Sequence, residues 1–169
     1  DSESRAGAHS AARGQVPDVV DAMGKMSDRF FGEPTRSMTV FGVTGTNGKT
    51  TVTYFLEAIT AAAGGRPAVV GTVNYRYRGQ DGVLREAPSV NTTPASLDLL
   101  RWLAECRNAG CTHAALEISS HALALRRADE VEFDAAVFTN IRRDHLDFHK
   151  TPEDYLRAKA RLFELLSRT

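Results

Sequence analysis

A glycine-rich turn in the first third of the chain has the clearest chemical signature. The segment 42–51 reads GVTGTNGKTT, after an apolar run at 38–43 and before a helical pattern at about 49–63. A strand, such a turn and a helix in this order form a phosphate-binding loop, because backbone N–H groups and the helix dipole favour anions there. We expect Lys49 to reach the terminal phosphates and the hydroxyl of Thr50 to contact a magnesium ion.

The spacing of this turn departs from the strict P-loop pattern at one position. That pattern requires a glycine five residues before Gly48, where this chain has Val43, and the glycine stands at position 45 instead. A tight strand-to-helix turn without a ligand is the alternative interpretation. The preceding strand, the two glycines and the following helix favour phosphate binding over that alternative.

Polar residues follow two other predicted strands. Glu117 ends the apolar segment 113–116, and Asn140 ends the segment 135–139. A carboxylate in this position is either solvated beyond the sheet or directed at a cation. His145 lies beyond the second of these strands, at the edge where the phosphate loop is expected, and this placement favours a metal ligand over an ordinary polar loop residue.

One lysine falls within the apolar stripe of the last predicted helix. Lys159 lies four residues after Tyr155 and three before Leu162, so the three side chains share one face. In one interpretation the stem of the lysine is buried and its amine extends into water. In the other, burial lowers the pKa of the amine, and the neutral amine reacts with carbon dioxide to form a carbamate that binds metal.

Three further motifs match functional patterns only in part. Thr93 precedes Pro94, where it either caps a helix or binds a polar substrate through its hydroxyl. The segment 119–121 reads SSH, but no G-x-S-x-G elbow is present, so a nucleophilic serine is not expected. His145 and His149 lack the glutamate that a zinc hydrolase has after the first histidine, so a zinc site is not expected either.

The hydrophobic pattern from residue 38 onward alternates between strands and helices. Strands are predicted at 38–43, 68–73, 112–118 and 135–140, helices at 49–63, 94–109, 119–127 and 152–166, and a hairpin at 75–87. This alternation is typical of an α/β fold with a mostly parallel sheet flanked by helices on both faces. In such folds ligands bind at the carboxyl ends of the strands.

The N-terminal part of the chain has a different character. Residues 1–15 show no periodicity, which indicates a linker or a disordered lead-in. Apolar residues then recur at helical spacing: Val16, Val19, Val20, Met23, Met26 and Phe30. This spacing predicts a short amphipathic helix over 16–31 whose apolar stripe packs on the domain that follows.

Composition excludes several classes of function. The 21 basic and 21 acidic residues give a formal net charge of zero, so charge favours neither nucleic acid nor an acidic membrane as a partner. No apolar run reaches the length of a membrane span, and the N-terminus lacks the apolar core of a signal peptide. Two cysteines do not form a disulfide framework. We therefore expect a cytoplasmic protein that binds neither nucleic acid nor membrane. We also expect a monomer.

Together these segments resemble the Mur ligases, the ATP-dependent amide ligases of peptidoglycan synthesis. The resemblance covers about 39–163 and rests on TGTNGKTT, NTTP, EISSHAL with Arg127 after it, FTN, DHLDFH and YLRAKARLF. The phosphate loop alone would also fit folylpolyglutamate and cyanophycin synthetases. The combination of NTTP with EISSHAL is most similar to the MurE branch, which joins meso-diaminopimelate or L-lysine to UDP-MurNAc-L-Ala-D-Glu.

The resemblance implies a role for each matched residue. ATP is held by Gly45, Thr46, Asn47, Gly48, Lys49, Thr50 and Thr51, with Asn140 near the nucleotide. Two Mg²⁺ ions are held by Thr50, Glu117, His145 and Lys159, the last as a carbamate. The UDP-MurNAc-dipeptide is held by Asn91, Thr92, Thr93, Ser119 and Arg127. The resemblance implies that Lys49, Glu117, His145 and Lys159 are catalytic and that an acyl phosphate is the intermediate.

The resemblance also implies a division of the chain. We expect residues 1–37 to be a linker and remnant of an N-terminal domain, and residues 38–169 to be the first part of the central ATP-binding domain, without the C-terminal ligase domain. The chain alone is then expected not to ligate. A nucleotide-binding module without turnover is the alternative function, but it would not need Glu117, His145 and Lys159 together.

Overall fold

The computed structural model describes residues 15–142 and 144–166. The strands are β1 (Thr39–Thr44), β2 (Pro67–Val70), β3 (Asn74–Arg78), β4 (Leu84–Pro88), β5 (His113–Glu117) and β6 (Ala135–Phe138). The helices are α1 (Val19–Phe30), α2 (Lys49–Ala62), α3 (Ser96–Asn108), α4 (Ser120–Ala124), α5 (Leu146–His149) and α6 (Pro152–Glu164), with a 3₁₀ turn η1 (Pro34–Ser37).

These strands form one sheet in the order β4-β3-β2-β5-β1-β6. The pairs β2·β5, β5·β1 and β1·β6 are parallel, whereas β3 and β4 form an antiparallel hairpin at one edge. The predicted α/β fold with a mostly parallel sheet is therefore confirmed, as is the hairpin. Val43 lies opposite Glu117 and Thr44 opposite Phe138. The carboxyl ends of β1, β5 and β6 consequently lie side by side, as a strand-end site requires.

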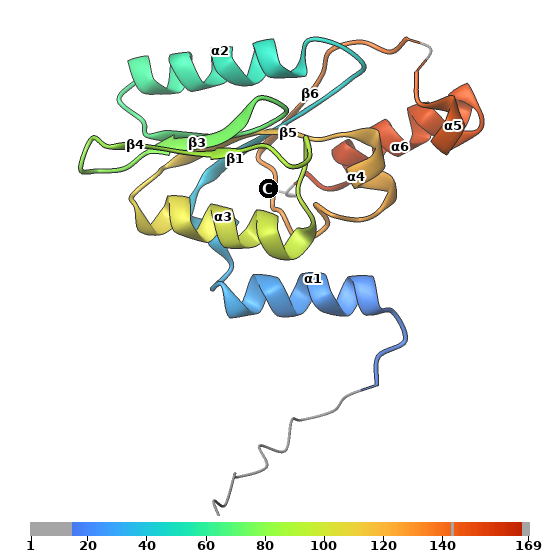
Figure 1. The fold of residues 1–169 in the computed structure, drawn as a ribbon, viewed down its shortest axis with the longest axis horizontal. Helices are drawn as coiled ribbons and strands as arrows, with labels where there is room; N and C mark the ends of the chain where they lie inside the picture. Colours follow the sequence, from blue (N-terminus) through green and yellow to red (C-terminus); the bar gives the residue numbers. More distant parts are fainter. Residues whose placement is uncertain (1–14, 143, 167–169) are drawn as a thin grey trace, which may run out of the picture.

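Helices cover both faces of the sheet. In Figure 1, α2 lies above the sheet and α3 below it, and α1 lies beneath α3 as a further layer. Between α3 and the sheet, Val40, Val70 and Leu116 pack with Leu99 and Leu103. All five of these residues are fully buried. Burying each leucine stabilises the fold by about 2–3 kcal/mol. None of the helices in the described residues has the length and apolar character needed to cross a membrane.

Several local features differ from the sequence-based prediction. The strand predicted at 68–73 ends at Val70, because the chain turns at Gly71 and its N–H bonds to the carbonyl oxygen of Asn74 at 3.3 Å. The turn η1 and the short helix α5 lie in segments for which no element was predicted. Both are short, and a hydrophobic period cannot be recognised over four residues.

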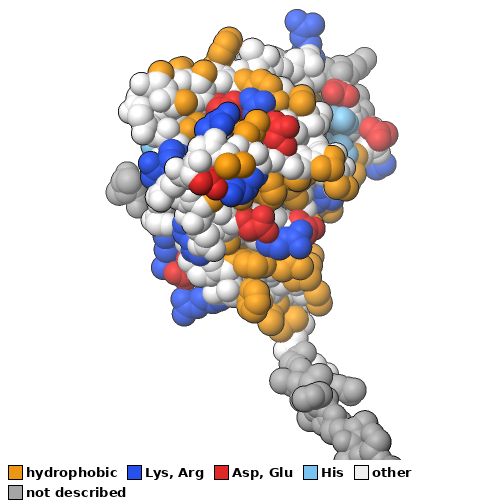
Figure 2. All heavy atoms as spheres, turned by 60° about the vertical axis from the view of Figure 1, so that its left-hand side comes forward, with side chains coloured by type: hydrophobic (Ala, Val, Ile, Leu, Met, Phe, Trp, Pro, Cys, Tyr) orange, Lys and Arg blue, Asp and Glu red, His pale blue; other side chains and the backbone are white. Residues whose placement is uncertain are grey.

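The helix predicted at 16–31 is confirmed as α1, but the predicted burial of its apolar stripe is wrong. The side chains of Val19, Met26 and Phe30 are exposed by 66%, 70% and 82%. The buried residues of α1 are instead Gly24 and Ser27. Figure 2 shows hydrophobic side chains gathered at the lower end of the molecule, where α1 lies. The apolar stripe of α1 therefore points outward.

Polar contacts hold α1 in this orientation. Asp18 caps the helix by accepting hydrogen bonds from the N–H groups of Val20 and Asp21, at 2.9 and 3.1 Å. Arg126, which follows α4, forms ion pairs with both Asp18 and Asp21. It also pairs with Asp129 at 2.8 Å, so one guanidinium joins α1 to the segment after α4.

Candidate active site

The phosphate loop joins β1 to α2 and requires glycine at two positions. Gly48 is the N-cap of α2 with φ of +83°, and Gly45 has φ of +141°. Both lie in a region that L side chains rarely adopt. A Cβ atom on Gly45 would also lie 2.0 Å from the hydroxyl oxygen of Thr139. The glycine at position 45, which departs from the strict P-loop spacing, is thus required by the packing of the segment after β6 against the loop.

The end of β6 holds the loop in place. The N–H of Thr46 donates to the carbonyl oxygen of Asn140 at 2.9 Å, and the N–H of Asn47 donates to its side-chain oxygen at 3.1 Å. The amide nitrogen of Asn140 donates back to the carbonyl of Asn47 at 3.0 Å. The structure therefore places Asn140 against the loop backbone. The backbone N–H groups that remain available to a phosphate are those at the start of α2, where Lys49 and Thr50 lie. The N–H groups in the first turn of a helix have no acceptor within the helix.

Two lysines converge on the loop. The amine of Lys49 donates to the carbonyl oxygens of Gly45 and Thr46, both at 3.1 Å. The amine of Lys159 donates to the same oxygen of Gly45 at 2.8 Å. Burial lowers the pKa of Lys49. Burial, and secondarily the charge of Lys49, lower the pKa of Lys159 to about 8.

The position of Lys159 excludes one of its two interpretations. The residue is only 2% exposed, so its amine does not extend into water and the first interpretation is wrong. Its amine lies 4.5 Å from the ring centroid of Tyr155, one helical turn earlier on α6. The hydroxyl of Tyr155 in turn lies 3.0 Å from that of Thr46. The buried face of α6 therefore contacts the phosphate loop through both Lys159 and Tyr155. Phe163, on the same helix, is 41% exposed.

Glu117 ends β5 at the same edge of the sheet and is 1% exposed. Its two carboxylate oxygens accept hydrogen bonds from the N–H and the hydroxyl of Thr72, at 3.1 and 3.0 Å. Its charge also acts on the nearby amine of Lys49, where it opposes the effect of burial on the pKa. The carboxylate is thus fixed beside the phosphate loop and is not solvated beyond the sheet.

The segment 91–94 lies against the end of β5. The hydroxyl of Thr93 donates to the carbonyl of Glu117 at 2.8 Å and accepts from the N–H of Ser119 at 3.0 Å. Arg127 donates to the carbonyl of Thr93 at 3.2 Å. The structure thus brings four of the predicted substrate residues together, with Thr92 beside Thr93. The interpretation of Thr93 as a helix cap is wrong, because Ala95 is the N-cap of α3.

His145 directly precedes α5 and has a strained conformation with φ of +50°. Its N–H donates to the carboxylate of Asp144 at 2.9 Å, and its side chain is 46% exposed. Its ring lies 4.9 Å from that of His121 and 6.1 Å from that of Tyr155. Among residues 15–142 and 144–166, no group of three or more His, Cys, Asp or Glu residues is placed to hold a metal. The metal role of His145 stays a prediction.

Oxygen atoms at the strand ends fit a magnesium ion. Mg²⁺ prefers oxygen ligands and keeps several waters, so it does not need a cluster of protein side chains. The carboxylate of Glu117 would be one such ligand, and the hydroxyl of Thr50, at the start of α2, would be another. The hydroxyl oxygen of Thr44 is buried at the end of β1 and has no hydrogen-bond partner in the described residues. This donor set fits Mg²⁺ bound next to a phosphate.

Comparison with known proteins agrees with this geometry. The model of the Mur ligase middle domain matches residues 43–169. The chain belongs to the Mur ligase family. Two relatives, both named UDP-N-acetylmuramoyl-L-alanyl-D-glutamate–2,6-diaminopimelate ligase, are similar over most of this Mur ligase chain. The protein of Geobacter metallireducens is 46% identical over 154 residues, and that of Solibacter usitatus is 47% identical over 164 residues.

The matches cover most of this chain and a smaller part of each relative. The alignments include 90% and 96% of the chain but 29% and 32% of these curated relatives. A solved structure of the same named ligase superposes with a TM-score of 0.76 and 34% identity, over 90% of this chain and 30% of that one. A MurF ligase from Thermotoga maritima has the same fold, with a TM-score of 0.61 at 22% identity over 92% of this chain and 33% of that one.

Sequence reasoning missed two residues of this Mur ligase site. Thr72 binds both oxygens of Glu117, and Thr139 donates to the carbonyl of Asn47 at 2.6 Å. Thr72 lies near the end of the strand predicted at 68–73, as Glu117 does in the strand predicted at 112–118, and that position was the available signal. Thr139 was counted within a strand, and only its contact with the loop reveals its function.

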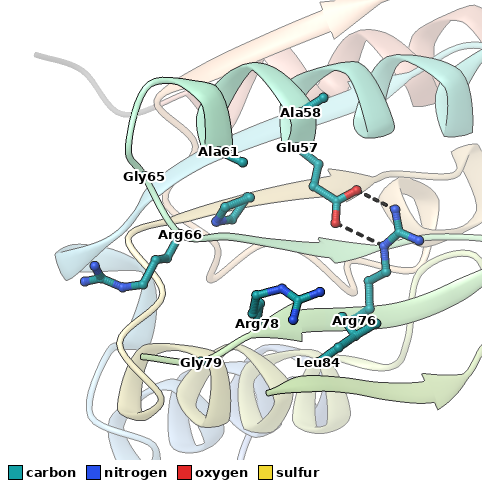
Figure 3. Close-up of a pocket in the computed structure, with 10 residues that line it drawn as sticks. Glu57, Ala58, Ala61, Gly65, Arg66, Arg76, Arg78, Gly79 and Leu84 are labelled. Atoms are coloured by element: carbon teal, nitrogen blue, oxygen red, sulfur yellow. Dashed lines mark hydrogen bonds and ion pairs between the residues drawn. The ribbon is translucent and has the colours of Figure 1, made fainter. Parts of the chain in front are cut away.

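A separate pocket of about 420 Å³ lies between α2 and the β3–β4 hairpin and contains none of the predicted site residues. Figure 3 shows Arg76 directed at Glu57, with which it forms an ion pair, while the guanidinium of Arg66 points away from Arg78. Arg66 and Arg78 donate to the backbone carbonyls of Gly110 and Gly82. The charged groups of this pocket are thus used within the protein, and the candidate active site of the Mur ligase chain remains the strand-end edge.

Proposed function

We propose that this chain provides the ATP-binding centre of a cytoplasmic ligase that joins a diamino acid to UDP-MurNAc-L-Ala-D-Glu. The observation that carries the proposal is the convergence of Lys49 and Lys159 on the loop oxygen of Gly45, beside the buried carboxylate of Glu117. The names of the relatives support 2,6-diaminopimelate as the incoming amino acid.

The chemistry requires two anions to approach each other. The γ-phosphate of ATP is transferred to a carboxylate of the muramoyl dipeptide, and the resulting acyl phosphate is attacked by the amine of the diamino acid, with release of phosphate. The positive charge of Lys49 and the N–H groups at the start of α2 offset the negative charge on the transferred group. Magnesium, when bound, would neutralise further charge on the phosphate oxygens.

The remaining residues orient the muramoyl dipeptide. Thr93 and Arg127 hold the segment 91–94 against the end of β5. The hydroxyl of Thr92 and the side chain of Asn91 are then available at the strand-end edge for polar groups of the substrate. This placement supports, for segment 91–94, the muramoyl-binding role that the resemblance implies.

We infer that Lys159 acts as a carbamate. With a pKa of about 8, roughly one-tenth of the amine is neutral at pH 7, far more than for an exposed lysine. The neutral nitrogen forms a bond to the carbon of carbon dioxide and loses one proton, which leaves an anionic carbamate at the loop. A carbamate oxygen supplies the kind of hard ligand that magnesium prefers.

Product formation by the full-length protein tests the proposed function. We expect ATP-dependent formation of the UDP-MurNAc tripeptide with 2,6-diaminopimelate, and little product with L-lysine. Folate with glutamate is the control for a folylpolyglutamate synthetase, and product there would contradict the proposal. Nucleotide binding without any product would favour the alternative of a nucleotide-binding module. We expect no tripeptide from the 169-residue chain alone.

A further inference from the structure

Thr72 lies between two parts of the candidate site that are distant in sequence. Its hydroxyl donates to one carboxylate oxygen of Glu117 at 3.0 Å, and its N–H donates to the other at 3.1 Å. The same hydroxyl lies 3.0 Å from the hydroxyl of Thr92 in the segment 91–94. One side chain therefore contacts both the predicted metal ligand and the predicted substrate segment.

The direction of these hydrogen bonds follows from the number of protons. An ionised carboxylate can only accept, so the single hydroxyl proton of Thr72 is used on Glu117. In the pair with Thr92, Thr72 must then accept and Thr92 must donate. Thr92 therefore donates to Thr72, and Thr72 donates to Glu117. The lone pairs of Thr92 stay available for a donor on the substrate.

The backbone before Thr72 makes this arrangement close and rigid. A Cβ atom on Gly71 would lie 2.2 Å from a carboxylate oxygen of Glu117, so only glycine allows the approach. The turn that begins there is closed by the hydrogen bond from Gly71 to Asn74. A second link runs in parallel, from the hydroxyl of Thr93 to the backbone carbonyl of Glu117 at 2.8 Å. Segment 91–94 is thus connected to both the side chain and the backbone of Glu117.

We propose that Thr72 is a positioning residue that couples the muramoyl-dipeptide segment to the metal-binding carboxylate of Glu117. The inference rests on the proposed function. When the dipeptide orders Thr92, the hydroxyl of Thr72 holds Glu117 in the orientation that binds a divalent cation. Because coupling between two sites is reciprocal, the cation also strengthens binding of the dipeptide. The pair of sites then fills together, which limits cation binding without the substrate.

Manganese titration of the full-length protein, followed by electron paramagnetic resonance, tests this coupling without turnover. In the unsubstituted protein we expect UDP-MurNAc-L-Ala-D-Glu to tighten Mn²⁺ binding about fivefold. Thr72→Val keeps the shape of the side chain but removes its proton and its acceptor, so the tightening should disappear. Thr72→Ser keeps the hydroxyl and should retain the tightening.

The outcomes separate this inference from the proposed function. Tightening that survives in Thr72→Val would overturn the role of Thr72 while leaving the ligase proposal intact. Loss of tightening in both variants would show that the threonine acts only through packing, and would also overturn it. If the unsubstituted protein does not bind UDP-MurNAc-L-Ala-D-Glu at all, the proposed function itself is wrong. A matched Thr60→Val variant, on α2 away from the segment, should retain the full tightening.

Discussion

Lys49 and Lys159 donate to one backbone oxygen, the carbonyl of Gly45, at 3.1 and 2.8 Å. The two amines come from residues 110 positions apart, one at the start of α2 and one on α6. Two positive charges on one carbonyl oppose each other, and this repulsion contributes to the lowered pKa of Lys159. The relationship places an amine of lowered pKa at the phosphate loop, and the first two predictions depend on it.

Substitution of Lys159 should remove ligase activity with little effect on nucleotide affinity. In the full-length protein, we expect Lys159→Ala to lower kcat by about 100-fold or more, because a proposed ligand of the magnesium ion beside the transferred phosphate is lost. The measurement is tripeptide formation with bicarbonate present, together with the Kd of ATP. Arg157→Ala, on the exposed face of the same helix, is the matched control and should leave kcat unchanged. Activity retained in Lys159→Ala would contradict the carbamate.

The stability of the chain should depend on pH through Lys159. The pKa of this amine is about 8 in the folded state and near its ordinary value of 10.5 when unfolded. The unfolded state therefore binds more protons between these values, and stability rises as pH increases through that window. Relative to Lys159→Met, the unsubstituted chain should gain up to about 3 kcal/mol of unfolding free energy from pH 8 to 10.5.

Urea denaturation of both chains in buffer free of carbon dioxide measures this difference, since a carbamate would remove the titrating amine. A constant difference between the two chains across the window would show that the amine of Lys159 has an ordinary pKa. Below about pH 7 the difference should become level, because the amine is then almost fully protonated in both states.

The glycine at position 45 should be more sensitive than another glycine with positive φ. Gly45→Ala places a methyl group 2.0 Å from Thr139 and should lower the unfolding free energy by about 2–4 kcal/mol. Gly64→Ala has the same kind of backbone strain but no atom within 4 Å, and should cost about 1 kcal/mol. Thermal or urea denaturation compares the two. Equal costs would mean that Thr139 does not pack against the loop as described.

Arg127 should affect binding of the muramoyl dipeptide more than binding of ATP. Its guanidinium holds the carbonyl of Thr93, so Arg127→Ala should raise the KM of UDP-MurNAc-L-Ala-D-Glu about tenfold or more and that of ATP by less than about twofold. Steady-state kinetics of the full-length protein measures both constants. Arg126→Ala is the matched neighbour, because Arg126 pairs with Asp18, Asp21 and Asp129 and should change neither KM. Equal effects of Arg127→Ala on both substrates would contradict its assignment.

The outward face of α1 should tolerate charge. In the 169-residue chain, Met26→Lys and Phe30→Lys should each change the unfolding free energy by less than about 0.5 kcal/mol, because both side chains are mostly exposed. If the stripe were buried, each substitution would cost several kcal/mol. Gly24→Val is the contrasting change, since a Cβ there lies 3.1 Å from the side chain of Glu130. Denaturation of the three variants distinguishes the two orientations.

Much of the fold could be predicted from local pattern. The order of strands and helices, the hairpin and the phosphate loop all depend on residues close together in the chain, where period and turn chemistry act directly. The candidate site could be predicted in outline for the same reason: polar residues after parallel strands must meet at one edge. Glu117 and Asn140 were placed correctly by this argument alone.

Contacts between distant segments could not be predicted in the same way. Thr93 has a good sequence for a helix cap, yet its hydroxyl is used on Glu117, 24 residues away. Thr72 has no motif of its own, and its role appears only because β2 pairs with β5. The apolar stripe of α1 can be recognised from its helical spacing, but the spacing does not show whether the stripe faces the domain or points outward.

The sequence by itself therefore determined that a phosphate loop, a carboxylate and a lysine exist at positions that a parallel sheet can bring together. Only the tertiary structure decided that Lys159 is buried with its amine on Gly45, that Thr72 binds Glu117, and that the apolar face of α1 points outward. The physical reason is that periodicity and turn chemistry are local properties. Burial and hydrogen-bond partners depend instead on the strand order and on which helix packs against which face.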